Sequence, residues 1–194
     1  MPERLCIQPF EDLLASRHHV SPARLESPAP DGLQLDRIFW AAAAAPDHGQ
    51  LTPWRFVIIP AEQRKLLAES FALALIDRDP SASAAQIEMA REKAGRAPLL
   101  ILCIGKLGVD QSPASPLERM ISLGAAVQNM LLAAKAMGFD SGITSGKAMA
   151  SRHMRELFEL HEGEETVCFL SFGTATKRKP PRNRPNPSTF VSTL

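Results

Sequence analysis

Residues 45–56 read APDHGQLTPWRF, and they join a predicted helix to a predicted strand. The segment from Gly32 to Ala45 has an apolar face and a run of alanines, with Asp31 before it as a candidate N-cap. Residues 54–59 are rich in aromatic and β-branched side chains, which is the pattern of a buried strand. Residues 46–53 therefore form a short loop between two rigid elements. Polar side chains in such loops often meet ligands.

Asp47 and His48 are the polar side chains that this loop presents. Two interpretations stay open for them: they cap the turn, or they contact a ligand. Capping is the commoner role of Asp at such positions. The choice depends on whether other parts of the chain supply a second set of ligand-binding groups.

The remaining periodicity predicts several more elements on both sides of this loop. We expect helices over residues 10–15, 32–45, 61–95 (two helices broken at Asp79-Pro80), 117–137 and 152–160, and strands over 54–59, 98–104 and 166–172. The run 98–104 is continuously apolar, as in a strand covered on both faces. Helices surrounding a few buried strands indicate an α+β domain with a small mixed sheet. The long helix over 117–137 carries little charge and is predicted to be its buried central helix.

The composition of the chain limits its expected partners, its number of domains and its cellular location. The 194 residues include 22 Lys and Arg against 21 Asp and Glu, so the net charge of +1 favours neither nucleic acid nor a membrane surface as partner. We expect a single domain over residues 1–194. Three cysteines and no evident N-terminal signal predict a cytoplasmic protein.

Trp40 and Trp54 are expected in the core.

Basic side chains gather at two places far apart in the sequence. Arg17, His18 and His19 follow the first predicted helix, and Arg182 and Arg184 lie in a basic, proline-rich extension over residues 175–194. They could complement a helix dipole or remain solvated. Alternatively they converge on a phosphate, which separate loops commonly bind together. We expect the extension to pack on the domain or on a partner subunit.

Other catalytic and binding motifs are absent from the sequence. Residues 141–148 approach a phosphate loop, but the first glycine is displaced and Lys147 is followed by Ala148. No G-x-S-x-G elbow exists, and no cysteine has a local activating partner. We expect no metal site.

The order of several short motifs resembles the nitroreductase superfamily, and within it the small bacterial NAD(P)H nitroreductase branch. The motifs are Leu13-Leu14, Arg17-His18, Arg24, Pro28-Ala29-Pro30, Ala45-Pro46-Asp47-His48, Pro53-Trp54-Arg55-Phe56, Gly124-Ala125-Ala126, Gln128-Asn129, Ala136-Met137-Gly138, Ser145-Gly146 and Phe172-Gly173-Thr174. The resemblance covers nearly the whole chain.

This resemblance implies a homodimer with a central mixed or antiparallel sheet surrounded by helices, and FMN in a cleft at the subunit interface. NADPH or NADH would reduce the flavin, which would then pass hydride to a nitroaromatic, quinone-like or other electron-poor acceptor in ping-pong order. FMN would carry the chemistry, so no side chain is expected to be catalytic. A degenerate FMN-binding protein, or a specialised flavin dehydrogenase or dehalogenating reductase, remains an alternative.

The resemblance also implies roles for particular residues. Arg17 and His18 match a pair at the FMN phosphate and ring, and His19 stands where serine is usual. His48 matches a flavin contact from the partner subunit. The other cofactor-binding candidates are Ala44, which replaces an arginine, Gln50, which with Thr52 replaces the more usual Asn and Gln, Thr144 and Ser145 on a flavin-contacting segment, and Arg182 and Arg184 at the phosphate.

Overall fold

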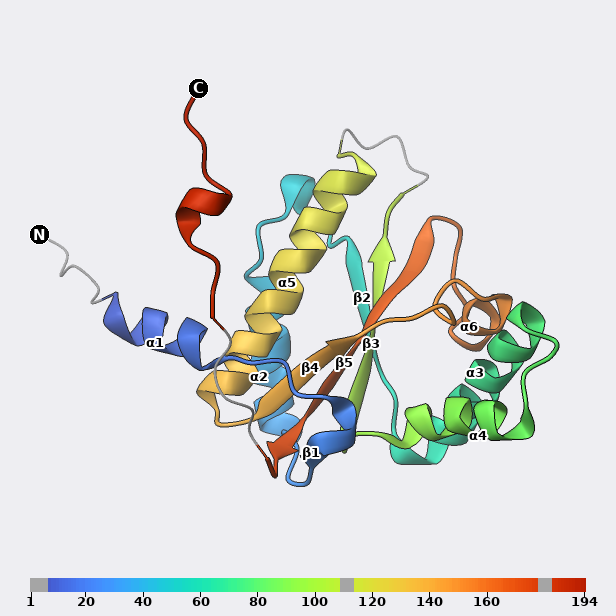
Figure 1. Ribbon diagram of the computed structural model, residues 1–194. Coiled ribbons are helices and arrows are strands. Elements are labelled where there is room, and N and C mark those ends of the chain that lie inside the picture. Colours follow the sequence, from blue (N-terminus) through green and yellow to red (C-terminus); the bar gives the residue numbers. More distant parts are fainter. Residues whose placement is uncertain (1–6, 109–113, 178–182) are drawn as a thin grey trace, which may run out of the picture.

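An antiparallel sheet runs through the middle of the molecule (Figure 1). The structure is a computed structural model that describes residues 7–108, 114–177 and 183–194. The strands are β1 Leu25–Glu26, β2 Trp54–Ile58, β3 Leu99–Lys106, β4 Asp140–Thr144 and β5 Glu164–Ala175. The long strand β5 pairs with β3 along one edge and with β4 along the other, β2 extends the sheet beyond β3, and β1 pairs with the end of β5. The predicted α+β class is confirmed.

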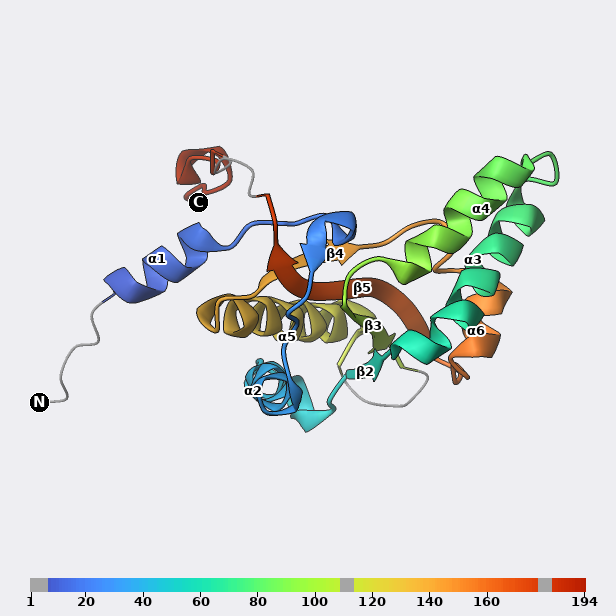
Figure 2. The same cartoon turned by 90° about the horizontal axis from the view of Figure 1, so that it is seen from below.

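Helices cover both faces of this sheet. They are α1 Gln8–Ser16, α2 Gly32–Ala43, α3 Arg64–Arg78, α4 Ala84–Glu92, α5 Pro116–Ala136 and α6 Arg152–Leu157, with 3-10 turns η1 Pro22–Arg24, η2 His48–Gln50, η3 Ala61–Gln63, η4 Lys93–Gly95 and η5 Pro187–Thr189. Figure 2 shows α2 and α5 on one face, and α3, α4 and α6 gathered at the other. No helix in the described ranges is long and apolar enough to cross a membrane.

Strand alternation builds a separate hydrophobic core on each face. On β3, Ile101 and Cys103 face α2 and α5, whereas Leu100 and Leu102 face α3 and α6. Cys168 lies opposite Cys103 on β5, and both cysteines are buried. The continuous apolar run of β3 is therefore explained by burial on both sides, as predicted.

The predicted helices and central strands are all present, with small shifts at their ends. Asp31 caps α2 in a reciprocal arrangement with Gln34, which confirms the N-cap, but the helix ends at Ala43 rather than Ala45. The break at Asp79-Pro80 separates α3 from α4. The strands β1 and β4 were not predicted, because they are short and carry little apolar alternation.

The core prediction was right for Trp54, which is buried, and wrong for Trp40, whose exposed fraction is 78%. Helix α5 is buried on one side only, since Leu117 and Ile121 on its other side are 77% and 72% exposed. The prediction that this helix is the buried centre of the fold therefore holds for its sheet-facing half. Its outer side carries an uncovered apolar stripe.

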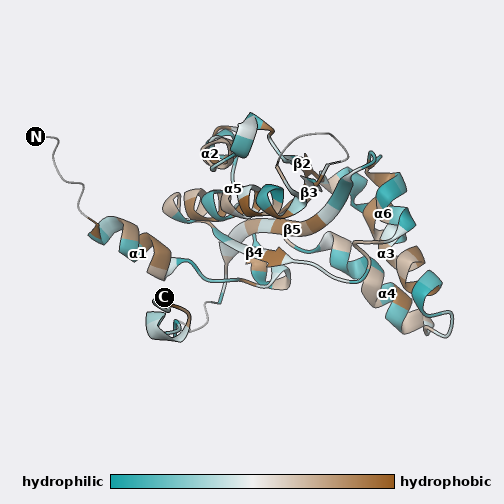
Figure 3. Cartoon of the chain, turned by 90° about the horizontal axis from the view of Figure 1, so that it is seen from above, coloured by the Kyte–Doolittle hydropathy of each residue, from teal (hydrophilic) through white to brown (hydrophobic). Residues whose placement is uncertain are grey.

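Helix α1 and the tail from Asn183 project from the same side of the body (Figures 1 and 2). Every described residue of the tail from Asn183 to Leu194 is exposed, and α1 has no buried residue. Figure 3 shows apolar residues on α1 although the helix stands away from the sheet. The tail is joined to the residue that follows α1, because the Arg184 guanidinium donates to the Arg17 carbonyl oxygen at 3.0 Å.

Candidate functional site

Arg17 and Arg184 come together although 167 positions separate them in the sequence. Partial burial, and then the neighbouring positive charge of Arg184, lower the pKa of Arg17. Neither arginine forms an ion pair with a described residue, so their charges repel each other without compensation. An anion bound between the two guanidinium groups would compensate this repulsion. Arg182, the other predicted phosphate ligand, lies outside the described residues.

His18 and His19 lead from this arginine pair toward the sheet. His19 forms an isolated bridge to Ser141, and the Val20 amide donates to the Ser141 carbonyl oxygen at 2.9 Å. A Cβ at Gly142 would lie 2.1 Å from the Val20 carbonyl oxygen, so only glycine permits this close approach. The segment thus runs against β4, and its four residues of chain span at most about 14 Å.

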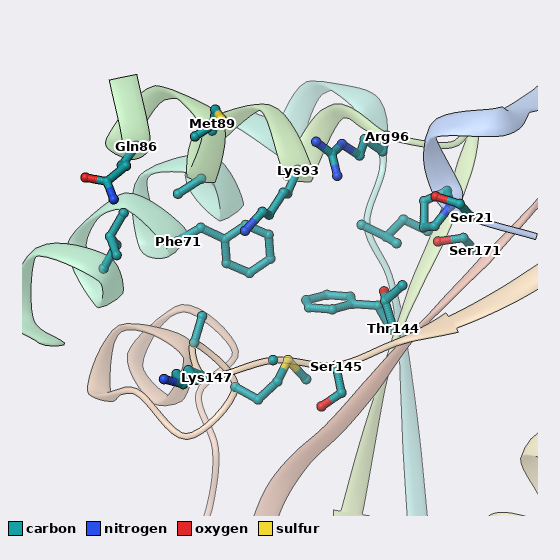
Figure 4. A pocket seen from close by; sticks show the side chains of 18 of the residues that line it. Ser21, Phe71, Gln86, Met89, Lys93, Arg96, Thr144, Ser145, Lys147 and Ser171 are labelled. Atoms are coloured by element: carbon teal, nitrogen blue, oxygen red, sulfur yellow. The ribbon is translucent and has the colours of Figure 1, made fainter. Parts of the chain in front are cut away.

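At the end of this segment, Ser21 borders a cavity of about 640 Å³. That volume lies within the range of about 300–1,000 Å³ that is typical of small-molecule sites. The cavity lies between the α3–α4 pair, the sheet and the loop after β4 (Figure 4). Its apolar walls include Phe71, Met89, Leu100, Met149 and Phe169. Phe71 meets Phe169 edge to face at a centroid distance of 5.7 Å.

The charged side chains that line this cavity are all basic. They are Arg78, Lys93, Arg96 and Lys147, and no Asp or Glu lines the cavity in the part of the chain that the structure describes. None of the four forms an ion pair with a residue that the structure describes. In Figure 4, Lys93 points into the cavity while Arg96 lies at the end near Ser21. Such a cavity favours a ligand that carries negative charge or many hydrogen-bond acceptors.

Thr144 and Ser145, two predicted cofactor contacts, line the same cavity, and so does Ser171. Ser171 is fully buried, and its Oγ has no hydrogen-bond partner within the described ranges. Leaving such a hydroxyl unpaired costs on the order of 1–3 kcal/mol. A ligand with a polar edge would satisfy it. A flat heteroaromatic ring with a phosphate arm therefore fits the residues present: apolar walls, basic edge, an orphaned hydroxyl and a nearby arginine pair.

The remaining predicted residues lie on the opposite face of the sheet. Ala44 is the C-cap of α2, while His48 and Gln50 belong to η2, which packs against α5. His48 Nδ1 lies 3.2 Å from Glu118 Oε1. Hydrogen bonds from the Ser115 backbone and hydroxyl, and then from His48, lower the pKa of Glu118. One copy of the chain does not bring these residues to the cavity.

The loop that carries His48 is held in a strained conformation. Gln50 and Thr52 both have positive φ, at 55° and 46°, which is unfavourable for a β-branched residue such as threonine. The Asp47 carboxylate accepts the Thr52 amide at 2.7 Å through Oδ2. Asp47 therefore stabilises the turn, which was one of its two interpretations. Its Oδ1 is buried with no hydrogen-bond partner in the described part of the chain.

The polar and basic lining residues that were not predicted from the sequence are Ser21, Arg78, Gln86, Lys93, Arg96, Lys147 and Ser171. Lys93 and Arg96 follow α4 and precede β3, so a basic pair at a helix-to-strand junction was the available signal. Among the described residues, the cavity lining contains no His, Cys, Asp or Glu. The described lining therefore offers neither a thiolate nor a carboxylate base.

A family model described as Nitroreductase family matches residues 25–174. Among curated proteins, "Putative NAD(P)H nitroreductase YdjA" of Escherichia coli strain K12 is 36% identical over 185 residues, which cover 93% of this chain and 97% of that protein. A "Putative NAD(P)H nitroreductase" of Haemophilus influenzae is 33% identical over 155 residues, covering 80% and 83%.

Solved structures with the same fold include a nitroreductase-like family protein from Bacillus cereus, with a TM-score of 0.81 at 19% identity over 100% of this chain and 98% of that one. The FMN- and NADPH-dependent nitroreductase NfnB from Sphigopyxis sp. strain HMH gives a TM-score of 0.74 at 17% identity, covering 95% and 98%. These similarities show the shared fold.

Proposed function

The chain belongs to the nitroreductase family and is a nitroreductase-type oxidoreductase, and from this premise we propose that it uses FMN to carry reducing equivalents from NADPH or NADH to a small electron-poor acceptor. The observation that supports FMN most directly is that two binding features lie next to each other along the chain. An uncompensated pair, Arg17 and Arg184, leads within four residues of chain to a basic cavity with apolar walls. The relative NfnB is named as FMN- and NADPH-dependent.

Each part of the site has a distinct role in holding the cofactor. Arg17 and Arg184 would bind the phosphate, with His18 and His19 beside them. Thr144, Ser145 and Ser171 would offer hydrogen bonds to the ring. Phe71 and Phe169 would exclude water from the ring and hold it by contact.

Bound FMN would supply the redox chemistry by accepting a hydride and passing it on. Lys93 and Arg96 provide positive charge in a cavity shielded by apolar walls, so they would stabilise negative charge that develops at the ring edge. Neither residue needs to transfer a proton for this effect. Their contribution is electrostatic stabilisation of that charge.

A second copy of the chain would complete the site. The outer side of α5 exposes Leu117 and Ile121, and α2 exposes Leu33 and Trp40, so large apolar side chains of both helices stand uncovered. Pairing two copies through these side chains would bury them, and would carry Ala44, His48 and Gln50 of one chain toward the other. The projecting α1 and the tail over residues 183–194 would pack on that partner.

Anaerobic titration of the FMN-loaded protein with NADPH, and separately with NADH, tests this proposal. Loss of the visible flavin absorbance followed by its return on adding a nitroaromatic would support an enzyme. Stable yellow protein whose absorbance neither nicotinamide changes would indicate a flavin-binding protein without turnover. A colourless protein with no affinity for FMN would reject the cofactor itself.

A further inference from the structure

The cavity extends beyond the end that meets the Arg17 segment. Ser21, Arg96 and Ser171 gather at that inner end, near the sheet. The outer end lies between the last turn of α3 and the first turn of α4, where Gln86 lines the wall, and Lys147 approaches from the loop after β4 (Figure 4). The two ends therefore offer separate groups to separate parts of a ligand or to two ligands.

The polar groups at the outer end are donors. Arg78 is the last residue of α3, and neither it nor Lys147 has an ion-pair partner in the described part of the chain. Asp77 and Asp79 flank Arg78 in the sequence. Asp77 Oδ2 accepts from the Arg152 guanidinium, and Asp79 Oδ1 accepts both the amide and the hydroxyl of Ser81, while the Asp79 charge also interacts with Arg78. The Gln86 carbonyl oxygen accepts the Ser83 amide at 2.8 Å, so its amino group is left to donate.

Apolar side chains separate these donors from the inner end. Phe71 and Leu75 of α3 and Met89 of α4 form the wall between them. A ligand that fits this stretch is flat and apolar in its middle and negatively charged at its outer tip. Arg78 and Lys147 line this end, and no Asp or Glu among the described residues lines the cavity, so the two cations would attract such a tip and fix its orientation.

Building on the proposed function, we propose that the electron acceptor is an acidic aromatic compound whose carboxylate is bound by Arg78 and Lys147. Its electron-poor end then points along Phe71 and Met89 toward the inner end of the cavity. Arg78 and Lys147 are thus specificity-determining residues for charge.

A binding experiment on FMN-loaded, oxidised protein tests this inference without turnover. Isothermal titration with 4-nitrobenzoate and with the neutral 4-nitrobenzyl alcohol measures the two dissociation constants. We expect the carboxylate to bind at least about tenfold more tightly, which is the scale of one charge-assisted hydrogen bond. The ratio should shrink at about 1 M salt, where the Debye length is about 3 Å.

Substitutions test whether Arg78 and Lys147 cause the tighter binding of the carboxylate. In the double variant Arg78→Ala with Lys147→Ala, the ratio of the two dissociation constants should approach one, and Arg78→Lys should retain part of it. Lys65→Ala is the matched control, because Lys65 is an exposed cation on α3 that does not line the cavity. The Lys65→Ala variant should show the same ratio of the two dissociation constants as the unsubstituted protein. Flavin absorbance checks that each variant is folded and loaded.

Equal dissociation constants for the two probes in the unsubstituted protein would overturn the inference while leaving the proposed function intact. A ratio that survives the double substitution would overturn the assignment to Arg78 and Lys147. If the protein bound no FMN, the proposed function would fail instead. The same titrations on FMN-free protein would then still decide whether the outer end recognises a carboxylate.

Discussion

The two faces of the sheet are built from the same strands but differ in how completely helices cover them. Toward α2 and α5, the side chains of Ile38, Met130 and Phe172 are fully buried in a continuous core. Toward α3, α4 and α6, the core around Leu67 and Met154 is equally closed, but it stops at a cavity of about 640 Å³. One face stabilises the fold, and the other combines stability with a basic binding site.

Replacing a large side chain on the closed face should have the greatest effect on stability. Phe172→Ala should lower the free energy of unfolding by about 4 kcal/mol, because it leaves a void in a close-packed core. Phe169→Ala on the other face should cost about half as much, since that ring already borders open space. Urea denaturation followed by circular dichroism measures both. Equal losses would mean that the cavity face is packed as tightly as the closed face.

The next largest effect concerns a paired charge on the cavity face. Arg55 donates two hydrogen bonds to the Glu164 carboxylate, at 3.1 and 2.6 Å, and Glu164 is buried. Glu164→Ala leaves Arg55 without this partner and should cost about 3 kcal/mol of unfolding free energy. Glu165→Ala is the control, because its pairing with Arg155 is longer and more exposed, and should cost a few tenths of a kcal/mol.

This pair also predicts a pH dependence. The hydrogen bonds from Arg55 lower the pKa of Glu164 below its unfolded value of about 4.3. The carboxylate therefore stabilises the fold fully above that value, and the contribution is lost as the pH falls through the lowered pKa. Urea midpoints between pH 7 and pH 3 should fall less steeply in Glu164→Ala than in the unsubstituted protein. Parallel curves would show that the pair does not titrate with unfolding.

Removing an unpaired charge should weaken ligand binding and leave the stability of the fold nearly unchanged. Arg17→Ala should weaken FMN binding by about 1.5–3 kcal/mol if the guanidinium bonds the phosphate, with little loss of stability because its charge has no acidic partner among the described residues. Arg184→Ala should act similarly, and Lys65→Ala should not. Quenching of flavin fluorescence gives the dissociation constants. An unchanged value in Arg17→Ala would remove Arg17 from the site.

The smallest effect is expected at Ser171. Ser171→Ala removes a buried hydroxyl that has no partner within the described ranges, so the FMN-free protein should become more stable by up to about 1 kcal/mol. The affinity for FMN should fall by a similar amount if the hydroxyl bonds the ring. Thermal unfolding with and without FMN separates the two effects. Lower stability without FMN would show that the hydroxyl already has a partner.

The sequence predicted the central strands and the helices better than the cavity between them. Apolar runs such as 98–104 and 166–172 identified the central strands, because burial on both sides leaves a continuous pattern. The convergence of Arg17 with Arg184 was also anticipated as a hypothesis, from unpaired basic residues. Trp40 was misplaced, because helical periodicity identifies an apolar face without showing whether the same chain covers it.

The cavity itself could not be predicted. Lys93 and Arg96 follow a helix whose pattern resembles any solvated surface, and only the angle between the α3–α4 pair and the sheet turns them inward. Strand β4 is five residues long and includes Gly142, so its sequence carries little strand signal. Long-range packing therefore decides which basic residues meet.

Gly142 has a practical consequence for altering this protein by laboratory evolution. Any side chain there would push away the Val20 backbone and separate the arginine pair from the cavity. Mutant libraries should therefore hold position 142 constant and diversify the α3–α4 hairpin instead. Changes in that hairpin can reshape acceptor choice while the cofactor cradle keeps its geometry.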